Sequence, residues 1–198
     1  MGELTEGLAH MFAQPEPAEV FADLIEGLLD GLPKKNGWTM SARAGHAGPE
    51  RIQKFLNAAS WDDAALVGAV RDYALARLGD EAAVLVVDDI QSIKKGDKSV
   101  GVAFRHCGTT GDVSNCQVMV MLTYAAPVGH TFLDRRLYLP ESRAHDAERR
   151  KEAGVPAEAG FLTKPRLAAL MLADALAAGV PFRWFASDSD EDSTFPGD

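Results

Sequence analysis

The sequence predicts an α/β protein in which a set of helices precedes a mixed β-sheet. Apolar residues recur with helical spacing over residues 1–80, and then alternate or run together, as in strands, over 81–187. A helix-like segment, 165–178, also stands between two strand-like segments, which is the usual crossover to a parallel strand. We therefore expect an all-helical domain over 1–80, an α/β domain over 81–187 and an acidic, disordered tail over 188–198.

Three segments of the first eighty residues have the apolar period of helices. Segment 17–32 places apolar side chains on one face and acids on the other, and it ends before a turn over 34–37. A second helix is expected to begin at Pro49. A third follows Ser60, which with Asp63 three residues later has the pattern of a capping box.

The second part of the chain has short apolar segments that are typical of strands. Between the second and third of them, Gly108–Asp112 has the composition of a hairpin turn. Residues 141–160 are polar and contain Pro and Gly, so a loop or a mobile helical excursion is expected there. Segment 165–178 begins with proline and ends before Gly179, as helices do. The expected strands are 83–87, 99–105, 117–124, 130–139 and 182–186.

Two aspartates come directly after two of these strands. Asp88 follows 83–87 and Asp188 follows 182–186. If both strands belong to one sheet, their carboxyl ends share an edge at which ligands and metal ions bind. Two carboxylates a few ångströms apart repel each other, so such a pair normally shares a divalent cation, and Mg²⁺ held in this way can assist phosphodiester cleavage. An acid after a strand is also commonly a turn former or a helix cap, and the spacing leaves both interpretations open.

Nine short strings, in order along residues 34–184, carry a resemblance to a known family. They are KKNGW, ASWDDAAL, VLVVDD, KKGDKSVGVA, NCQVMV, DRRLYLPES, AGVP, TKPRLA and AAGVPFRW. Together they resemble the N-terminal part of the DDE transposases of bacterial insertion sequences. The resemblance implies a ribonuclease H-like catalytic domain behind a helical domain that helps to hold transposon-end DNA. It also implies that Asp88 matches the first acid of the catalytic triad and Asp188 the second.

The chain departs from the family pattern around both acids. Asp89 and Ile90 stand where the family has Glu and Thr after the first acid. No residue matches the third acid, a glutamate, although Asp89 could take its place in part, and the last strand and helices of the family's fold are missing. We therefore expect an incomplete ribonuclease H-like mixed sheet in a truncated transposase-like protein that is inactive alone. A transposase-derived DNA-binding or regulatory protein without catalysis is the alternative.

The expected ligands and partners follow from the same residues. Mg²⁺ or Mn²⁺ would bind loosely between Asp88 and Asp188, as both catalytic and metal-binding residues, if any activity remains. The resemblance implies transposon-end DNA as a partner, and a second copy of the chain or the full-length transposase is a further candidate. Contacts with DNA phosphates are expected from a small set of basic residues, although a solvated turn and strand face explain them equally well: Lys94, Lys95, Lys98, Arg135 and Arg136.

Charge and composition exclude several other classes of protein. The formal net charge of −9 argues against a simple nucleic-acid coat protein. The run Arg149–Lys151 is interpreted as the end of a surface helix rather than a DNA clamp. No apolar segment is long enough to span a membrane, no secretory signal is recognised, and the only cysteines are Cys107 and Cys116. A cytoplasmic protein with free thiols is therefore expected.

Overall fold

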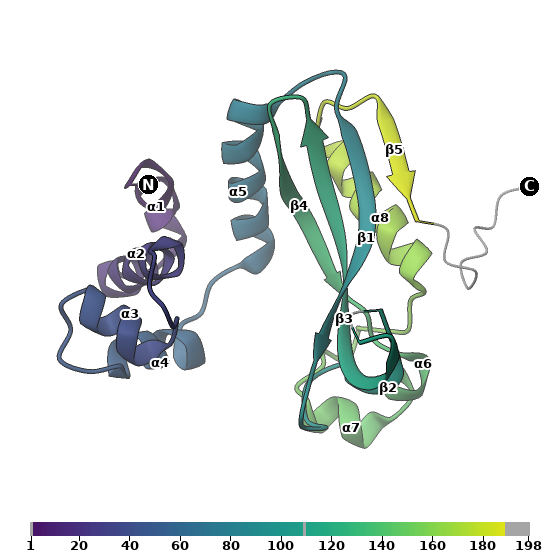
Figure 1. Ribbon diagram of the computed structural model, residues 1–198, viewed down its shortest axis with the longest axis horizontal. Helices are drawn as coiled ribbons and strands as arrows, with labels where there is room; N and C mark the ends of the chain where they lie inside the picture. The colour runs from purple at the N-terminus through teal and green to yellow at the C-terminus, as the bar shows by residue number, and fades with distance from the viewer. Residues whose placement is uncertain (1, 109, 189–198) are drawn as a thin grey trace, which may run out of the picture. The chain divides into compact units, whose positions relative to one another are not determined.

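The computed structural model describes residues 2–108 and 110–188 (Figure 1). The chain divides into two compact units, of which the first ends at Tyr73 and the second begins at Ala74. This division falls inside helix α5 (Asp63–Leu78), a few residues before the boundary at residue 80 that the sequence suggests. The second unit is a mixed α/β structure built on one mixed sheet.

The first unit is assembled from short amphipathic helices around a cluster of aromatic rings. Phe55 and Trp61 stack with ring centroids 5.2 Å apart, and Phe12 packs against both Phe21 and Phe55 at 5.3 and 5.9 Å. Ile52 beside them is completely buried. The elements of this unit are α1 (Gly2–Leu8), η1 (Ala9–Met11), α2 (Pro15–Leu29), α3 (Gly37–Arg43), α4 (Glu50–Ala58) and the first part of α5.

The sequence analysis missed one helix of this unit, α3, and it placed the cap of another at the wrong residue. The residues expected to form a turn over 34–37 lead directly into α3, because Asn36 accepts hydrogen bonds from the backbone N–H of Thr39 and the Thr39 hydroxyl accepts one from the backbone N–H of Asn36. The cap of α5 is Asp62 rather than Ser60. The carboxylate of Asp62 accepts hydrogen bonds from the backbone N–H groups of Ala64 and Ala65 at 3.0 and 3.1 Å.

The sheet of the second unit is built around one long strand, β3. Antiparallel partners occupy both of its edges: β1 pairs along one edge, and β2 and β4 pair in succession along the other. The other edge of β1 pairs in parallel with β5. The strands are β1 (Val84–Ile93), β2 (Ala103–Cys107), β3 (Asp112–Ala126), β4 (Gly129–Leu137) and β5 (Trp184–Ser187).

Helix α8 (Lys164–Ala177) connects β4 to β5 and packs on one face of the sheet (Figure 1). Its first turn is capped by Thr163, whose hydroxyl accepts from the backbone N–H of Arg166. The predicted crossover is therefore confirmed, since the strand after α8 lies beside β1 and runs parallel to it. The buried contacts between sheet and helix join alternate strand residues with one stripe of α8: Leu85, Val87, Val120 and Leu122 with Leu167, Ala168, Met171 and Ala175.

The structure corrects two further expectations in this unit. The first predicted strand does not end before Asp88 but continues as β1 to Ile93, because β3 is long enough to pair with all ten of its residues. Residues 141–160 are not simply a loop, since they contain the short helices α6 (Glu141–Ala144) and α7 (Ala147–Glu152).

Two remaining expectations concern the acidic C-terminal tail and the absence of a membrane span. Of the acidic tail predicted over 188–198, only Asp188 belongs to the described residues. Among the helices of the described residues, none combines the length and the apolar character that a membrane crossing requires.

Candidate functional site

Asp88 and Asp188 occupy equivalent positions on the two parallel strands. The last pair between β1 and β5 joins Val87 to Ser187, and each aspartate is the next residue of its chain segment. Paired residues on neighbouring strands lie about 4.8 Å apart and project to the same face. Both aspartates are exposed. The register of the parallel pair therefore brings the backbones of the two aspartates to one edge of the sheet, where both residues are exposed.

The backbone of Asp88 is held more firmly than that of a strand end. Asp88 pairs with Met121 of β3, and this pairing continues to Ile93, although the pairing with β5 has ended one residue earlier. Its carboxylate Oδ1 accepts a hydrogen bond from the backbone N–H of Asp89 at 2.7 Å. Asp88 therefore lies in the interior of a long strand, at the point where β5 ends and β1 keeps only β3 as a partner.

Asp89 belongs to the opposite face of the sheet. Successive residues of a strand point to opposite faces, so Asp89 shares the side of Val87, which packs under α8. Its carboxylate forms an ion pair with Lys164 at the start of α8 and is only 18% exposed. This geometry argues against Asp89 as a metal ligand beside Asp88, because strand alternation directs its carboxylate to the other face, where it pairs with Lys164.

Asp88 and Asp188 are the candidate metal ligands, and no third acid joins them among the described residues. No group of three or more His, Cys, Asp or Glu side chains within 2–108 and 110–188 is arranged to hold a metal. Asp88 and Asp188 nevertheless have the right chemistry, since Mg²⁺ and Mn²⁺ prefer carboxylate oxygens and bind through one or two carboxylates together with substrate phosphates. The donor set fits a loosely held divalent cation.

The two arginines proposed for DNA contact lie on different faces. Arg135 pairs with Met121, which on its other side pairs with Asp88, so the three residues form one row across the sheet on the face of Asp88. Two strand spacings separate Arg135 from Asp88, or about 10 Å. Arg136 lies on the opposite face, where its guanidinium pairs with Asp174 of α8 at 2.7 Å. Arg135 can therefore face a ligand of Asp88, whereas Arg136 fastens α8 to β4.

The three lysines lie in the loop that follows β1, residues 94–102, which we call the lysine loop. The side-chain amide of Asn115 shapes this loop by donating to the carbonyl oxygens of Lys94 and Gly96 at 3.0 and 2.9 Å. Lys98 pairs with Glu152 of α7, and this hydrogen bond holds the pKa of the Glu152 carboxyl below its ordinary value. Five strand residues, about 17 Å, separate Asp88 from the end of β1. Lys94, Lys95 and Lys98 therefore cannot contact the same phosphate as Asp88.

Sequence reasoning missed Lys164, which proves to be the partner of Asp89. It also missed the proximity of α6 and α7 to the lysine loop, where Arg149 lies 3.9 Å from Asp97. The string containing Lys164 was recognised, but nothing in its pattern indicates which strand residue it contacts. Only the crossover topology brings the start of α8 next to β1.

Comparisons with known proteins agree with the resemblance. A family described as DDE superfamily endonuclease matches residues 18–190. The chain is also similar to a curated protein named as the probable transposase for insertion sequence element IS701 of Microchaete diplosiphon, with 23% identity over 180 residues. That match covers 90% of this chain but 44% of the relative, so the chain spans less than half of the relative's length. No solved structure matches the chain.

Proposed function

Because the chain belongs to the DDE superfamily endonucleases, we propose that its sheet unit is part of a ribonuclease H-like catalytic domain that acts on transposon-end DNA. The observation that carries this proposal is the parallel pairing of β1 with β5, which brings Asp88 and Asp188 to one edge of the sheet. The order of the strands supports it as well, since an antiparallel set formed by β1, β3 and β4 is followed by a helical crossover and a parallel strand.

Asp88 and Asp188 are proposed to hold Mg²⁺ or Mn²⁺ against the phosphate that is cut. When bound, such an ion supplies Lewis-acid stabilisation of the phosphate charge and an activated water or hydroxyl. Asp88 would position its carboxylate from a strand that β3 keeps rigid. Arg135, in the same row of the sheet, would contact a neighbouring phosphate of the DNA from about 10 Å away.

This chain alone is proposed to leave transposon-end DNA uncut. Metal ions that catalyse strand transfer must be fixed to within about half an ångström, and two carboxylates hold an ion less firmly than three. The described residues contain no third acid next to Asp88, since Asp89 is committed to Lys164. The first unit is proposed to help hold the DNA end. A second copy of the chain, or a complete transposase, would be its protein partner.

Two measurements test this proposal together. Binding of Mn²⁺ is followed by calorimetry, and nicking is followed with labelled transposon-end DNA in the presence of Mn²⁺. We expect weak Mn²⁺ binding that Asp88→Ala reduces and no nicking above background. Asp97→Ala is the matched control, because Asp97 is an exposed acid of the lysine loop, with 73% of its side chain accessible. Nicking that Asp88→Ala abolishes would overturn the proposed inactivity, and Mn²⁺ binding that Asp88→Ala leaves unchanged would overturn the site.

A DNA-binding or regulatory role without catalysis is the second candidate. The presence of only two suitably placed carboxylates among the described residues favours it. In that case the chain would bind transposon-end DNA equally well with and without Mn²⁺, and Asp88→Ala would not change the affinity. A dependence of DNA binding on Mn²⁺ that disappears in Asp88→Ala would instead favour the catalytic interpretation.

A further inference from the structure

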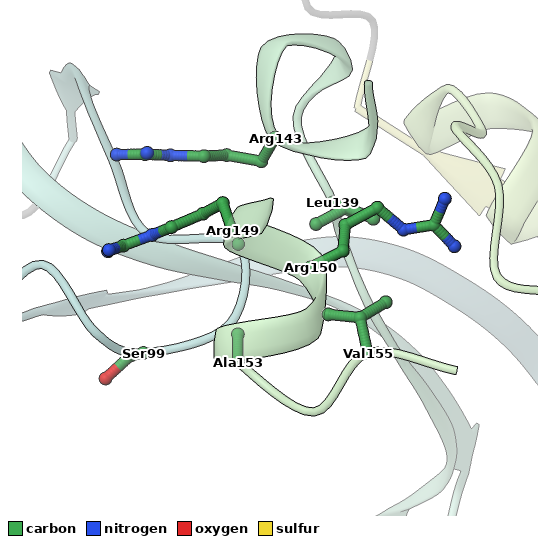
Figure 2. A pocket seen from close by; sticks show the side chains of 8 residues that line it. Ser99, Leu139, Arg143, Arg149, Arg150, Ala153 and Val155 are labelled. Atoms are coloured by element: carbon green, nitrogen blue, oxygen red, sulfur yellow. The ribbon is translucent and has the colours of Figure 1, made fainter. Parts of the chain in front are cut away.

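A small hollow lies between the lysine loop and the two short helices that follow β4. The hollow is shallow, with a volume of about 10 Å³, which is room for about one water molecule, so a larger ligand would lie at its mouth. Three of its lining residues are arginines, Arg143 from α6 and Arg149 and Arg150 from α7, and Ser99 of the loop lies across from them. Figure 2 shows that Arg143 and Arg149 extend side by side in one direction, whereas Arg150 extends in the other.

The positive charges of Arg143 and Arg149 are only partly balanced. Arg143 donates from Nε to the backbone carbonyl of Val102 at 3.1 Å, and this partner carries no charge. Arg149 pairs with Glu152 at 3.0 Å, but its Nη2 is buried and has no hydrogen-bond partner among the described residues. A buried guanidinium N–H without an acceptor is unfavourable. An anion placed between the two guanidinium groups would satisfy it.

The carboxylates around the hollow are too few for its cations. Glu152 serves Lys98 and Arg149 at the same time. Asp97 is 3.9 Å from Arg149 and largely exposed, so solvent and salt screen its contribution. Lys98 at the rim has 69% of its side chain accessible and can turn toward a ligand. The site therefore retains an excess of positive charge.

Arg150 has a different task. Its Nη2 donates to the carbonyl oxygens of Pro156, Ala157 and Ala159 at 2.9, 3.0 and 2.6 Å. These bonds fasten the segment that follows α7. Two adjacent arginines of one helix thus extend in opposite directions (Figure 2). Arg150 reaches the backbone carbonyls of the following segment, although its buried Nε has no partner among the described residues, and Arg149 extends beside Arg143.

From this geometry we propose that Arg143 and Arg149, with Lys98 at the rim, bind a phosphodiester group of the DNA backbone. Arginine is suited to this because its planar fork donates two parallel hydrogen bonds to phosphate oxygens. The inference rests on the proposed function, from which it takes DNA as the ligand. The hollow adjoins the loop at the end of β1, about 17 Å along that strand from Asp88. The bound phosphate would therefore be a different one from the phosphate held near Asp88.

The test measures how the affinity of the whole chain for duplex DNA depends on salt. Each lost phosphate contact lowers the slope of log K against log salt concentration by about 0.9. We expect Arg143→Gln and Arg149→Gln each to reduce the slope by about that amount, and to weaken binding of transposon-end and random duplexes by the same factor. Lys151→Gln is the matched control, since it removes the same charge from the same helix at an exposed residue that does not line the hollow, and it is expected to leave the slope unchanged.

The possible results separate this inference from the proposed function. Slopes that are equal for the wild-type chain, Arg143→Gln and Arg149→Gln would overturn the phosphate site and leave the proposed function standing. Failure of the wild-type chain to bind any duplex would overturn the proposed function and the site with it. Circular dichroism checks that each variant is folded. If Arg149→Gln unfolds, Arg143→Gln and Lys98→Gln decide the matter, because Lys98 is exposed and its replacement does not disturb packing.

Discussion

Replacing Lys164 with methionine should destabilise the sheet unit, because it removes the cation that faces the carboxylate of Asp89. Exposed ion pairs contribute about 0 to 1 kcal/mol, and breaking a fully buried pair costs about 3 to 5 kcal/mol. The side chains of Asp89 and Lys164 are 18% and 35% exposed, which places this pair between those limits. We therefore expect the free energy of unfolding to fall by about 1 to 2 kcal/mol in Lys164→Met.

A double-mutant cycle measures the interaction itself. Lys164→Met, Asp89→Asn and the double variant are unfolded in urea and followed by circular dichroism, and the coupling energy is expected to be about 1 kcal/mol. The adjacent acid provides the control cycle, in which Asp88→Asn replaces Asp89→Asn. Because Asp88 lies on the other face of β1, its coupling with Lys164 should be close to zero. Equal coupling energies in the two cycles would refute the assignment of Asp88 and Asp89 to opposite faces.

Three further predictions concern other parts of the sheet unit. Tyr124→Phe should lower the free energy of unfolding by about 1 to 3 kcal/mol, because the buried Tyr124 hydroxyl accepts from the N–H of Asp80 and donates to its carbonyl. Burial raises the pKa of the Cys116 thiol, so a thiol reagent at pH 8 should label it far more slowly in the native chain than in urea. Lys98→Gln should raise the pKa of Glu152 toward its ordinary value, measured by NMR titration. The stabilisation from that pair is present above the ordinary pKa of Glu152 and is lost as the pH falls through the lowered value.

Each of these predictions has its own contradicting result. Tyr138→Phe is the control for Tyr124→Phe, because the Tyr138 ring packs against Phe161 and under Arg105, and within the described residues its hydroxyl forms no hydrogen bond. Equal losses of stability in the two variants would contradict the role of the Tyr124 hydroxyl. Rapid labelling of native Cys116 would contradict its burial. A pKa of Glu152 that does not respond to Lys98→Gln would show that the ion pair is absent in solution.

The sequence was enough to predict that the two candidate acids lie at the same edge of the sheet, but it was not enough to predict the length of β1. A helix between two strand-like segments specifies a parallel crossover, and this was enough to place Asp88 near Asp188. The pair Asp88–Asp89 is a typical strand terminator by composition, yet β1 continues through it. Pairing with β3 supplies the backbone hydrogen bonds that outweigh local propensity, and the length of a partner strand cannot be read from β1 alone.

The proposed phosphate site could not be predicted from the sequence, for a related reason. Arg149 and Arg150 are adjacent and chemically identical, so sequence reasoning interprets them together as the end of a surface helix. Their roles differ because the chain after α7 returns to accept hydrogen bonds from Arg150, while the loop containing Ser99 faces Arg149. Ser99 is far from Arg149 in the sequence, and the segment that contacts Arg150 has no regular secondary structure. No periodic pattern in the sequence therefore predicts either contact.

Alternation along the strands explains why charges that are neighbours in the sequence have separate tasks. On the face covered by α8, Asp89 pairs with Lys164 near the start of the helix, and Arg136 pairs with Asp174 near its end. These two ion pairs join the helix to β1 and to β4. Asp88 and Arg135, one residue before Asp89 and Arg136, are thereby presented on the other face from a sheet that cannot slide relative to α8.

This arrangement also connects the strings that carry the family resemblance. VLVVDD contains Asp89, TKPRLA contains Lys164, and DRRLYLPES contains Arg136. A glutamate, which the family has at the position of Asp89, would project to the same α8-covered face, since alternation depends on position and not on side-chain length. Asp89→Glu should therefore keep the ion pair and the Mn²⁺ affinity that is proposed for Asp88, whereas Asp89→Leu should loosen α8 without changing the face that carries Asp88. Mn²⁺ affinity that falls in Asp89→Glu as much as in Asp88→Ala would show that Asp89 ligates the ion, and the division of the two faces would be wrong.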